Sequence, residues 1–422
     1  MRIGPASAFR GRYSLPGDKS ISHRAALLGA MAEGDTRVRN FSTAVDCAST
    51  LSCLAKLGVE IERHGSELVV HGRGVEAWRA PERALDAGNS GSTLRMLAGA
   101  LAGRPFRAVL SGDASLRRRP VERVAAPLRR MGARVSTTGG CPPLTVEGGA
   151  LRGIDCELEV ASAQVKTAVL LAGLQAEGAT TVREPAPSRD HTERMLPLFG
   201  AAVEREGLAA TVRGRARLTA AAIEVPGDVS SAAFFVVAAL VRPDSEVRLD
   251  GVLLSPGRTG FLDVLREMGA AIEVETVTTK PEPVGTIVAR SSRLRAVAVD
   301  PARVPALIDE VPALAAAAAF AEGTFFVSGA AELRVKESDR ITALAEGLGR
   351  MGVRVEERPD GLAVHGGGRL RGVRVRSFGD HRIAMALAVA ALGAEGPTEI
   401  EGAECVGVSF PGFFDLLAAG AR

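Results

Sequence analysis

Cations and hydroxyls stand directly in front of an apolar run near the N-terminus, in GDKSISHR at 17–24. Asp18 or Ser20 can be explained as the cap of a helix that begins here. Capping does not explain Lys19 and Arg24, because the positive end of a helix dipole disfavours cations. Two interpretations follow: a capped helix with solvated cations, or a site where a bound anion holds the cations at the helix end.

Further polar segments could bind the same anion or transfer protons. They are GDASLRRRP at 112–120, SRDHTERML at 188–196, ELRVKESDRI at 332–341 and the pair Asp309–Glu310. A capping interpretation stays open for Ser338 and for Asp309 and Glu310, which precede apolar helices. However, a protein that only binds anions gains nothing from Asp309 and Glu337 among its cations, whereas proton transfer requires such carboxylates.

Lysine is rare in this chain, which makes the position of each lysine informative. Of 52 basic residues only five are Lys, at positions 19, 56, 166, 280 and 336. An ammonium is a compact point charge, so a lysine kept in an arginine-rich chain indicates a specific need. Lys19, Lys166 and Lys336 belong to polar clusters, whereas Lys56 and Lys280 are expected on the surface.

One unit recurs six times along the chain and must position these residues. Its polar heads start at 17, 88, 161, 227, 308 and 379, and each precedes a helix of Ala, Leu and Val. Between the heads, Gly at 58, 132, 200, 269 and 352 follows an amphipathic helix and precedes an alternating strand. A weaker sixth copy at Gly420 has no strand after it, so we expect the N-terminal segment to supply that strand.

The repeat predicts an α/β fold with mixed sheets and two pseudo-symmetric domains of three units each. The expected domains are 1–13 plus 226–422 and 14–225, with two passages of the chain between them. Helix N-termini present free N–H groups and a positive dipole end. We therefore expect the six heads to line a cleft between the domains that binds phosphate or carboxylate groups.

Composition and motifs exclude several classes of protein. A net charge of +3 and 4% aromatic residues disfavour nucleic-acid binding, and no apolar run is long enough to span a membrane. The five cysteines form no CxxC, and the six histidines lack metal-ligand spacing, so neither zinc nor a disulfide framework is expected. The lack of a secretory signal predicts a cytoplasmic protein. P-loop, HExxH and GxSxG motifs are absent.

The polar motifs together resemble a known family. They are, in order, GDKSISHR, LDAGNSGSTLR, GDASLRRRP, ASAQVKTAVLLAG, SRDHTERM, IDEVP, ELRVKESDR and DHRIAM. This series closely resembles the 5-enolpyruvylshikimate-3-phosphate synthase family, in its bacterial class II form. The resemblance implies two domains of three βαββαβ units and a monomer without metal or organic cofactor. It also implies transfer of the enolpyruvyl group of phosphoenolpyruvate to the 5-hydroxyl of shikimate 3-phosphate, with release of phosphate.

The resemblance also implies roles for individual residues. Shikimate 3-phosphate would bind to Lys19, Ser20, Arg24, Ser162, Ala163, Gln164, Arg189, Asp309 and Lys336. Phosphoenolpyruvate would bind to Lys19, Gly91, Arg119, Gln164, Arg340 and Arg382, because guanidinium groups grip carboxylates and phosphates bidentately. Asp309 is the implied base toward the 5-hydroxyl, while Glu337 and Lys19 are the implied proton donors and acceptors.

Departures from the class I pattern accompany this resemblance. Ala163 replaces a Ser, Glu332 replaces an Asn, and Val408 stands where class I members place a phosphate-binding Lys. One rival is UDP-N-acetylglucosamine enolpyruvyl transferase, whose active-loop Cys is missing from 112–120. The other rival is a non-enzymatic protein of the same fold that binds anions or RNA.

Gly91 in GNSGS has two interpretations. A turn could require a positive φ there, which glycine adopts easily. By resemblance, the phosphoenolpyruvate pocket could instead approach this position closely. The herbicide glyphosate occupies that pocket in the family, and class II enzymes that tolerate it have Ala at this place.

Overall fold

The structure is a computed structural model that describes residues 1–422, and its chain divides into two units. The terminal unit comprises Met1–Pro16 and Pro226–Arg422, and the middle unit comprises Gly17–Val225. The first segment extends to Pro16 because strand β2, Arg10–Ser14, pairs with β15, Glu246–Leu253, of the terminal unit. No helix is both long and apolar enough to cross a membrane.

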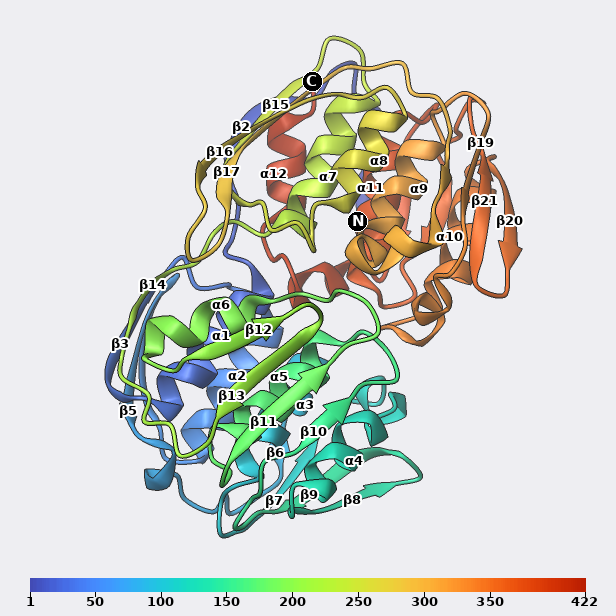
Figure 1. Cartoon of the computed structure of the whole chain (residues 1–422). Helices are drawn as coiled ribbons and strands as arrows, with labels where there is room; N and C mark the ends of the chain where they lie inside the picture. Colours follow the sequence, from blue (N-terminus) through green and yellow to red (C-terminus); the bar gives the residue numbers. More distant parts are fainter. The chain divides into compact units, whose positions relative to one another are not determined.

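The middle unit is built around three buried helices that begin at the first three polar heads. They are α1 (Lys19–Met31), α3 (Gly91–Leu101) and α5 (Ala163–Gly173). A second helix follows each one: α2 (Val45–Lys56), α4 (Glu122–Arg130) and α6 (His191–Met195). Helices α3 and α5 touch closely, since a Cβ on Gly99 would meet the Ala168 carbonyl at 2.0 Å. Figure 1 shows the sheets of this unit around its helices.

Each of the three sheets of the middle unit has four strands. The first has the order β14 (Ala222–Glu224), β3 (Glu33–Arg39), β5 (Glu67–Arg73), β4 (Glu60–His64). The second is β6 (Leu85–Asp86), β7 (Arg107–Ser111), β9 (Cys141–Glu147), β8 (Arg134–Thr138). The third is β10 (Asp155–Glu157), β11 (Ala179–Arg183), β13 (Ala209–Arg213), β12 (Val203–Glu206). In each, a parallel outer strand joins an antiparallel set.

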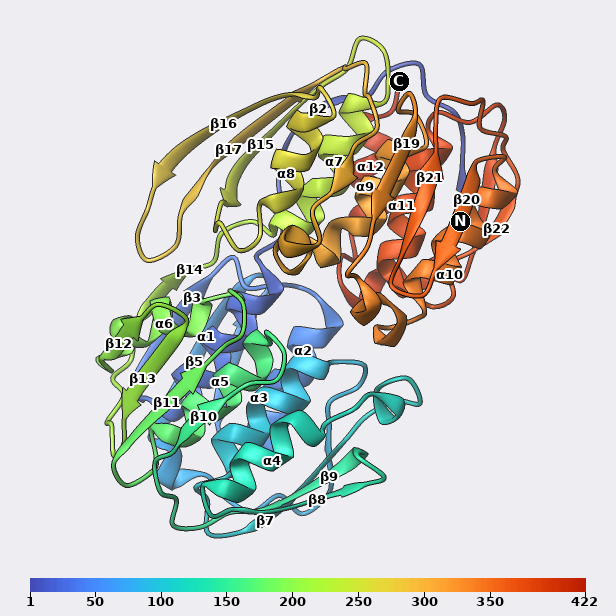
Figure 2. The same ribbon diagram turned by 45° about the vertical axis from the view of Figure 1, so that its right-hand side comes forward.

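The terminal unit repeats this plan. Its central helices are α7 (Val229–Leu240), α9 (Val311–Ala318) and α11 (His381–Ala391), and every residue in them is buried. The second helices are α8 (Gly260–Glu267), α10 (Arg340–Arg350) and α12 (Phe413–Gly420). Helices α7, α9 and α11 contact one another, and Figure 2 shows them enclosed by strands. Continuous Ala, Leu and Val runs suit helices that are covered on all sides.

The sheets of the terminal unit also contain the N-terminal strands. One sheet is β16 (Ala271–Thr278), β17 (Val284–Arg290), β15, β2, and the next is β18 (Ala298–Val299), β19 (Thr324–Val327), β21 (Gly361–His365), β20 (Arg354–Arg358). The last has three strands, β1 (Arg2–Ile3), β23 (Thr398–Glu401), β22 (Arg374–Arg376). Strand β1 pairs antiparallel with β23, which confirms that the N-terminal segment completes the sixth repeat.

The predicted glycine stops have the backbone conformation that a helix end requires. Gly58, Gly132, Gly200, Gly269 and Gly352 have φ of +89°, +113°, +82°, +93° and +95°. Side chains disfavour this left-handed region, and glycine ends helices there at little cost. Gly420 lacks a positive φ and is the last residue of α12, so the weaker sixth copy differs in geometry as well as in sequence.

Candidate active site

The first polar head forms the capped start of α1. Asp18 accepts a hydrogen bond from the Ile21 N–H at 2.9 Å, so Asp18, and not Ser20, is the cap. Lys19 Nζ lies 3.0 Å from the carboxylate of Asp46 on α2. Asp46 cannot be recognised as a partner of Lys19 from the sequence, since nothing in AVDCAST distinguishes it from a first-turn acid. The ammonium of Lys19 therefore stands at the helix end with a counterion from a neighbouring helix.

Arg24 is buried one turn into α1 and is held by hydroxyl and carbonyl oxygens. Its Nε donates to Thr192 Oγ1 at 2.8 Å, and its Nη2 donates to Thr167 Oγ1 at 2.8 Å. Its Nη1 donates to the Ser20 carbonyl at 2.9 Å. The Ser20 hydroxyl accepts a hydrogen bond from Arg189 Nη1 at 3.2 Å. The structure thus brings Ser20, Arg24 and Arg189 together.

The start of α5 adds amide and hydroxyl groups. Ser162 caps this helix by accepting from the Val165 N–H at 3.4 Å, and Ala163 and Gln164 form its first turn. Gln164 Oε1 accepts a hydrogen bond from Arg95 Nη1 at 2.9 Å. The Arg24 Nη2 also lies 3.4 Å from the Ala163 carbonyl. The heads of α1 and α5 are therefore neighbours, as the repeat requires.

Gly91 is the first residue of α3 and does not serve as a turn glycine. The positive φ in this loop belongs to Gly88, at +58°, whereas Gly91 has no positive φ, so the turn interpretation of Gly91 is wrong. A Cβ on Gly91 would lie 2.5 Å from Arg95 Nη1 and 3.7 Å from Arg119 Nη1. The close neighbours are therefore guanidinium groups. Arg95 was not among the predicted site residues, although its spacing of four from Gly91 places both on one helix face.

The three consecutive arginines at 117–119 differ in exposure. Arg117 and Arg118 are exposed, while Arg119 is buried. Arg119 Nη2 donates to Asn89 Oδ1 at 2.7 Å, and Asn89 Nδ2 in turn donates to Asp113 Oδ2 at 2.6 Å. This chain of hydrogen bonds fixes Arg119 beside the start of α3, close to Gly91.

His23 lies beneath the first head as a neutral buried side chain. Its Nδ1 is 2.7 Å from Thr50 Oγ1. Burial, together with the nearby charges of Lys19 and Arg24, lowers the pKa of His23 to about 3. The imidazole therefore adds no positive charge to this end of the helix at neutral pH.

In the terminal unit, Arg340 is the centre of a buried carboxylate cluster. Its Nε donates to Asp380 Oδ2 at 2.8 Å, and its Nη2 donates to Glu337 Oε2 at 2.6 Å. Its side chain is only 1% exposed. Burial alone would lower the pKa of Arg340, but the attraction of Asp380, Glu337 and Asp309 outweighs burial and raises it. Burial would raise the pKa of Asp380, but the charge and hydrogen bond of Arg340 outweigh burial and lower the pKa of that carboxyl.

Asp309 and Glu310 lie in a 3₁₀ turn, Ile308–Glu310, before α9. Glu310 is the N-cap residue of α9, but its side chain makes no capping hydrogen bond to that helix. Asp309 Oδ1 lies 3.4 Å from Arg340 Nη1 and 3.7 Å from Lys336 Nζ, while its Oδ2 lies 4.0 Å from Arg382 Nη2. The carboxylate therefore faces three cations, and such neighbours favour the ionised form.

A second buried chain of contacts leads away from Arg382. Arg382 Nη1 donates to the Asp309 carbonyl and lies 3.5 Å from Glu310 Oε1. Glu310 also accepts a hydrogen bond from Ser230 Oγ, which accepts one from Arg258 Nη2 at 2.7 Å. Ser230 and Arg258 were not among the predicted site residues, because the partners in this chain of contacts lie far apart in the sequence. The heads at 227, 308 and 379 are joined through this chain.

The KESDR segment at 336–340 caps the following helix with Asp339 and not with Ser338, the candidate from the sequence. Helix α10 begins at Arg340, and Asp339 caps it by accepting from the Thr342 N–H at 3.1 Å. Ser338, the expected cap, instead donates to Asp380 Oδ2 at 3.2 Å. This frees Glu337 to pair with Arg340 and places Lys336 against Asp309.

The structure thus gathers the predicted residues into two groups, one in each unit. The middle-unit group is Lys19, Ser20, Arg24, Gly91, Arg119, Ser162, Ala163, Gln164 and Arg189. The terminal-unit group is Asp309, Lys336, Glu337, Arg340 and Arg382. The first group can bind anions through guanidinium, hydroxyl and N–H groups. The second also contains carboxylates that can exchange protons.

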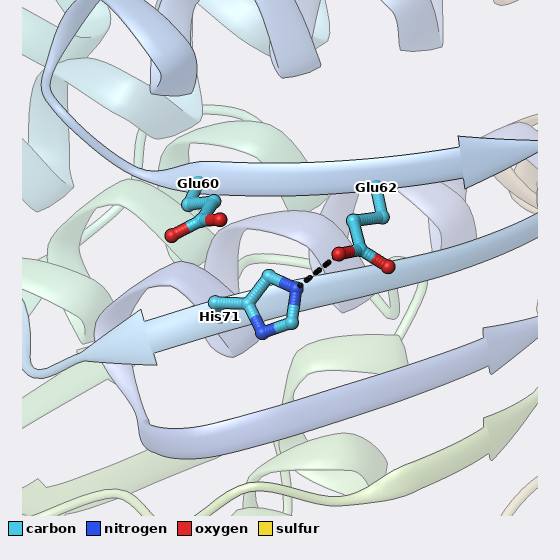
Figure 3. A group of neighbouring side chains, drawn as sticks. All are labelled: Glu60, Glu62 and His71. Atoms are coloured by element: carbon cyan, nitrogen blue, oxygen red, sulfur yellow. Dashed lines mark ion pairs between the residues drawn. The ribbon is translucent and has the colours of Figure 1, made fainter.

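One surface cluster has the composition of a metal site, drawn in Figure 3. Ligand atoms of Glu60, Glu62 and His71 all lie within 4.8 Å of one another on β4 and β5. His71 Nδ1 also lies 2.8 Å from Asp35 Oδ1. The hydrogen bond to Asp35 raises the pKa of His71 and favours its charged form, which cannot ligate a metal ion. The cluster is better described as a surface ion-pair network.

Comparison with known proteins first establishes the class. The fold of the enolpyruvyl transferase NikO from Streptomyces tendae matches with a TM-score of 0.78 over 100% of this chain and 97% of that chain, at 20% identity. At this identity the likeness concerns the fold alone. Together with the six repeats, it defines an enolpyruvyl transferase fold.

Closer matches identify the family. The model described as EPSP synthase (3-phosphoshikimate 1-carboxyvinyltransferase) matches residues 3–417. The 3-phosphoshikimate 1-carboxyvinyltransferase of Pelotomaculum thermopropionicum is 53% identical, over 99% of this chain and 98% of that protein. The structure of EPSP synthase from Acinetobacter baumannii matches with a TM-score of 0.89 at 45% identity, over 100% of this chain and 98% of that one. The chain belongs to the EPSP synthase family.

Proposed function

We propose that this protein transfers the enolpyruvyl group of phosphoenolpyruvate to the 5-hydroxyl of shikimate 3-phosphate and releases phosphate. The family supports the reaction, and both substrates are anions suited to the two groups of cations. The observation that carries the proposal is the set of three cations within 4.0 Å of the Asp309 carboxylate. A protein that only binds anions would lose affinity through a carboxylate in that position, whereas acid–base chemistry needs one.

The middle-unit group is proposed to hold shikimate 3-phosphate. Arg24 and Arg189 converge on Ser20, whose carbonyl and hydroxyl accept their hydrogen bonds. The capped starts of α1 and α5 add helix N-termini, which favour phosphate. Gln164 would contact both substrates, and Gly91 and Arg119 would contact phosphoenolpyruvate.

The terminal-unit group, together with Lys19 of the middle unit, is proposed to carry the proton transfers. Asp309 would accept the proton of the 5-hydroxyl while the hydroxyl oxygen forms a bond to C2 of phosphoenolpyruvate. Glu337 or Lys19 would deliver a proton to the methylene carbon, which gives a tetrahedral intermediate. Removal of a proton from that carbon and departure of phosphate would then restore the double bond. Both steps balance without a metal or an organic cofactor.

Substrate binding would also prepare Asp309 for its role. In the free chain, its neighbours Lys336, Arg340 and Arg382 all face the carboxylate, which makes it a weak base. The contact between Arg340 Nη1 and Asp309 Oδ1, at 3.4 Å, is longer than the hydrogen bonds that Arg340 donates to Asp380 and Glu337. We infer that substrate carboxylate or phosphate competes for these longer contacts. Proton affinity at Asp309 would then rise only when substrate is bound.

A phosphate-release assay tests the function directly. Phosphate should appear only when phosphoenolpyruvate and shikimate 3-phosphate are both present. Release with UDP-N-acetylglucosamine in place of shikimate 3-phosphate would support the rival enzyme. Binding of both substrates without turnover would support an anion-binding protein.

We also propose the class of the enzyme and its working form in the cell. The Ser162–Ala163–Gln164 sequence, Glu332 before LRVK and Val408 before Ser409–Phe410–Pro411 support the class II form. The working form is proposed to be a cytoplasmic monomer, which a sedimentation measurement of the mass in solution would check.

A further inference from the structure

We propose that Lys166 is a positioning residue for shikimate 3-phosphate, because its ammonium joins the segments that present the phosphate-binding side chains. This inference rests on the proposed function, since it concerns how that substrate is held. Lys166 Nζ lies 2.6 Å from Glu184 Oε2 and 2.7 Å from Glu193 Oε1. The side chains of Lys166, Glu184 and Glu193 are 4%, 4% and 3% exposed.

Stability alone is a poor explanation of this cluster. Two buried carboxyl groups share one ammonium. The second oxygens, Glu184 Oε1 and Glu193 Oε2, are buried without a hydrogen-bond partner. Burial of charges costs free energy, and well-packed apolar residues often stabilise a fold as much or more. The free-energy cost of this buried cluster is more consistent with a role in positioning the segments that Lys166 joins.

The cluster orients Arg24 through two neighbouring threonines. Thr167 follows Lys166 on α5, and Thr192 precedes Glu193 on α6. Their hydroxyls lie 2.6 Å apart, and each accepts a hydrogen bond from Arg24 at 2.8 Å. The ion pair between Lys166 and Glu193 therefore fixes the two helices whose hydroxyls hold the guanidinium.

The same ammonium fixes the loop that carries Arg189. Glu184 directly follows β11, and Glu193 lies on α6, so Lys166 binds the chain on both sides of this loop. Between these two points, Arg189 Nη1 reaches the Ser20 hydroxyl at 3.2 Å. A single side chain thus sets the positions of Arg24 and Arg189 relative to the start of α5.

The test compares Lys166→Met with a matched control in the same unit. The control is Arg104→Met, because Arg104 is also buried and donates to Gln175 Oε1 at 3.0 Å. Arg104 and Gln175 lie beyond the C-terminal ends of α3 and α5, away from the heads. Glu193→Gln is a milder variant that keeps the ammonium paired with Glu184, in case Lys166→Met does not fold.

We expect Lys166→Met to raise the Kd and KM of shikimate 3-phosphate by about tenfold or more, since small misplacements of binding groups have effects of this size. The kcat and the KM of phosphoenolpyruvate should change by less than about threefold, which is under 1 kcal/mol. The Kd of shikimate, which lacks the phosphate, should change much less than that of shikimate 3-phosphate. Glu193→Gln should show the same pattern with smaller changes, and Arg104→Met should lower only the melting temperature.

The outcomes separate this inference from the proposed function. If the unmodified protein releases no phosphate from the two substrates, the proposed function fails. If it is active and the folded Lys166→Met or Glu193→Gln variant binds shikimate 3-phosphate normally, the positioning role fails. Equal weakening toward shikimate and shikimate 3-phosphate would also overturn it, because a general loss of structure predicts that result.

Discussion

The two units place cations at the starts of buried helices, but they surround those cations with different groups. In the terminal unit, Arg340 bonds to Asp380 and Glu337, and Arg258 pairs with Asp228 at 3.1 Å. In the middle unit, threonine hydroxyls and backbone carbonyls accept from Arg24, and an asparagine amide accepts from Arg119. Apart from the pair between Lys19 and Asp46, carboxylates face the cations in the first arrangement and neutral oxygens face them in the second.

This difference indicates a division of work. Neutral acceptors orient a guanidinium but leave its charge available to an anion, which suits substrate binding. Carboxylates neutralise the cations and can also accept or deliver protons, which suits the chemical step. If the division is correct, variants in the terminal unit should mainly lower kcat, and variants in the middle unit should mainly raise KM.

The largest effect is expected at Asp309. Asp309→Asn keeps the shape of the side chain but cannot accept the hydroxyl proton, and loss of a general base lowers kcat by about 10²–10⁴. The KM values of both substrates should change little. Steady-state phosphate release would measure this, with Glu346→Gln as a control, since Glu346 pairs with Arg376 on the surface of the same unit. Near-normal turnover would remove Asp309 from the role of base.

The corresponding test in the middle unit is Arg24→Met. Loss of a charged hydrogen-bond donor costs about 1.5–3 kcal/mol, so the KM of shikimate 3-phosphate should rise about 10–100-fold. The kcat at saturation should fall less than the affinity does. Arg118→Met, at an exposed arginine of the same unit, is the control. A fall in kcat with an unchanged KM would contradict the division between the units.

Local patterns in the sequence predicted much of this architecture. The apolar runs after each head predicted buried helices, and helix-ending glycines such as Gly58 have the expected positive φ. Pairings between distant side chains could not be predicted in this way. Glu310 and Ser230 are 80 residues apart, and only the packing of α7 against the turn before α9 brings them together. A head motif shows that a cation is present, but it does not show which carboxylate or hydroxyl will face it.

Acid should weaken the two units in different pH ranges. His23 has a pKa of about 3 in the folded chain and an ordinary value near 6.5 when unfolded. Between these values the unfolded state binds one more proton, so the free energy of unfolding should fall by about 1.4 kcal/mol per pH unit as pH decreases from 6.5. The pKa of Asp380 is lowered in the folded chain. The stability that its ionised form contributes is therefore lost only as pH falls below the ordinary pKa range of an aspartate.

Denaturant unfolding at several pH values would measure this effect. His23→Asn should flatten the decrease in stability between pH 6.5 and pH 4.5, whatever its stability at neutral pH. His64→Asn, at an exposed histidine of the same unit, should leave the slope unchanged. Equal slopes in His23→Asn and the unmodified protein would mean that His23 is not the group that titrates.

The smallest expected effect tests how closely the middle unit fits its ligand. Gly91→Ala needs no unusual backbone angle, but its new methyl group would lie 2.5 Å from Arg95 Nη1 and force that guanidinium to move. Arg95 donates to Gln164, so the change reaches the proposed phosphoenolpyruvate site. An overpacked methyl costs about 1–3 kcal/mol, which predicts an increase of about tenfold in the inhibition constant of glyphosate.

The comparison with phosphoenolpyruvate distinguishes a pocket effect from a structural one. Glyphosate is the longer molecule, so its inhibition constant should rise more than the KM of phosphoenolpyruvate. Gly88→Ala is the matched control, because Gly88 has φ of +58° and its substitution strains the backbone. Gly88→Ala should lower stability and leave the ratio of the two constants unchanged. If Gly91→Ala also leaves that ratio unchanged, position 91 does not discriminate between the inhibitor and the substrate.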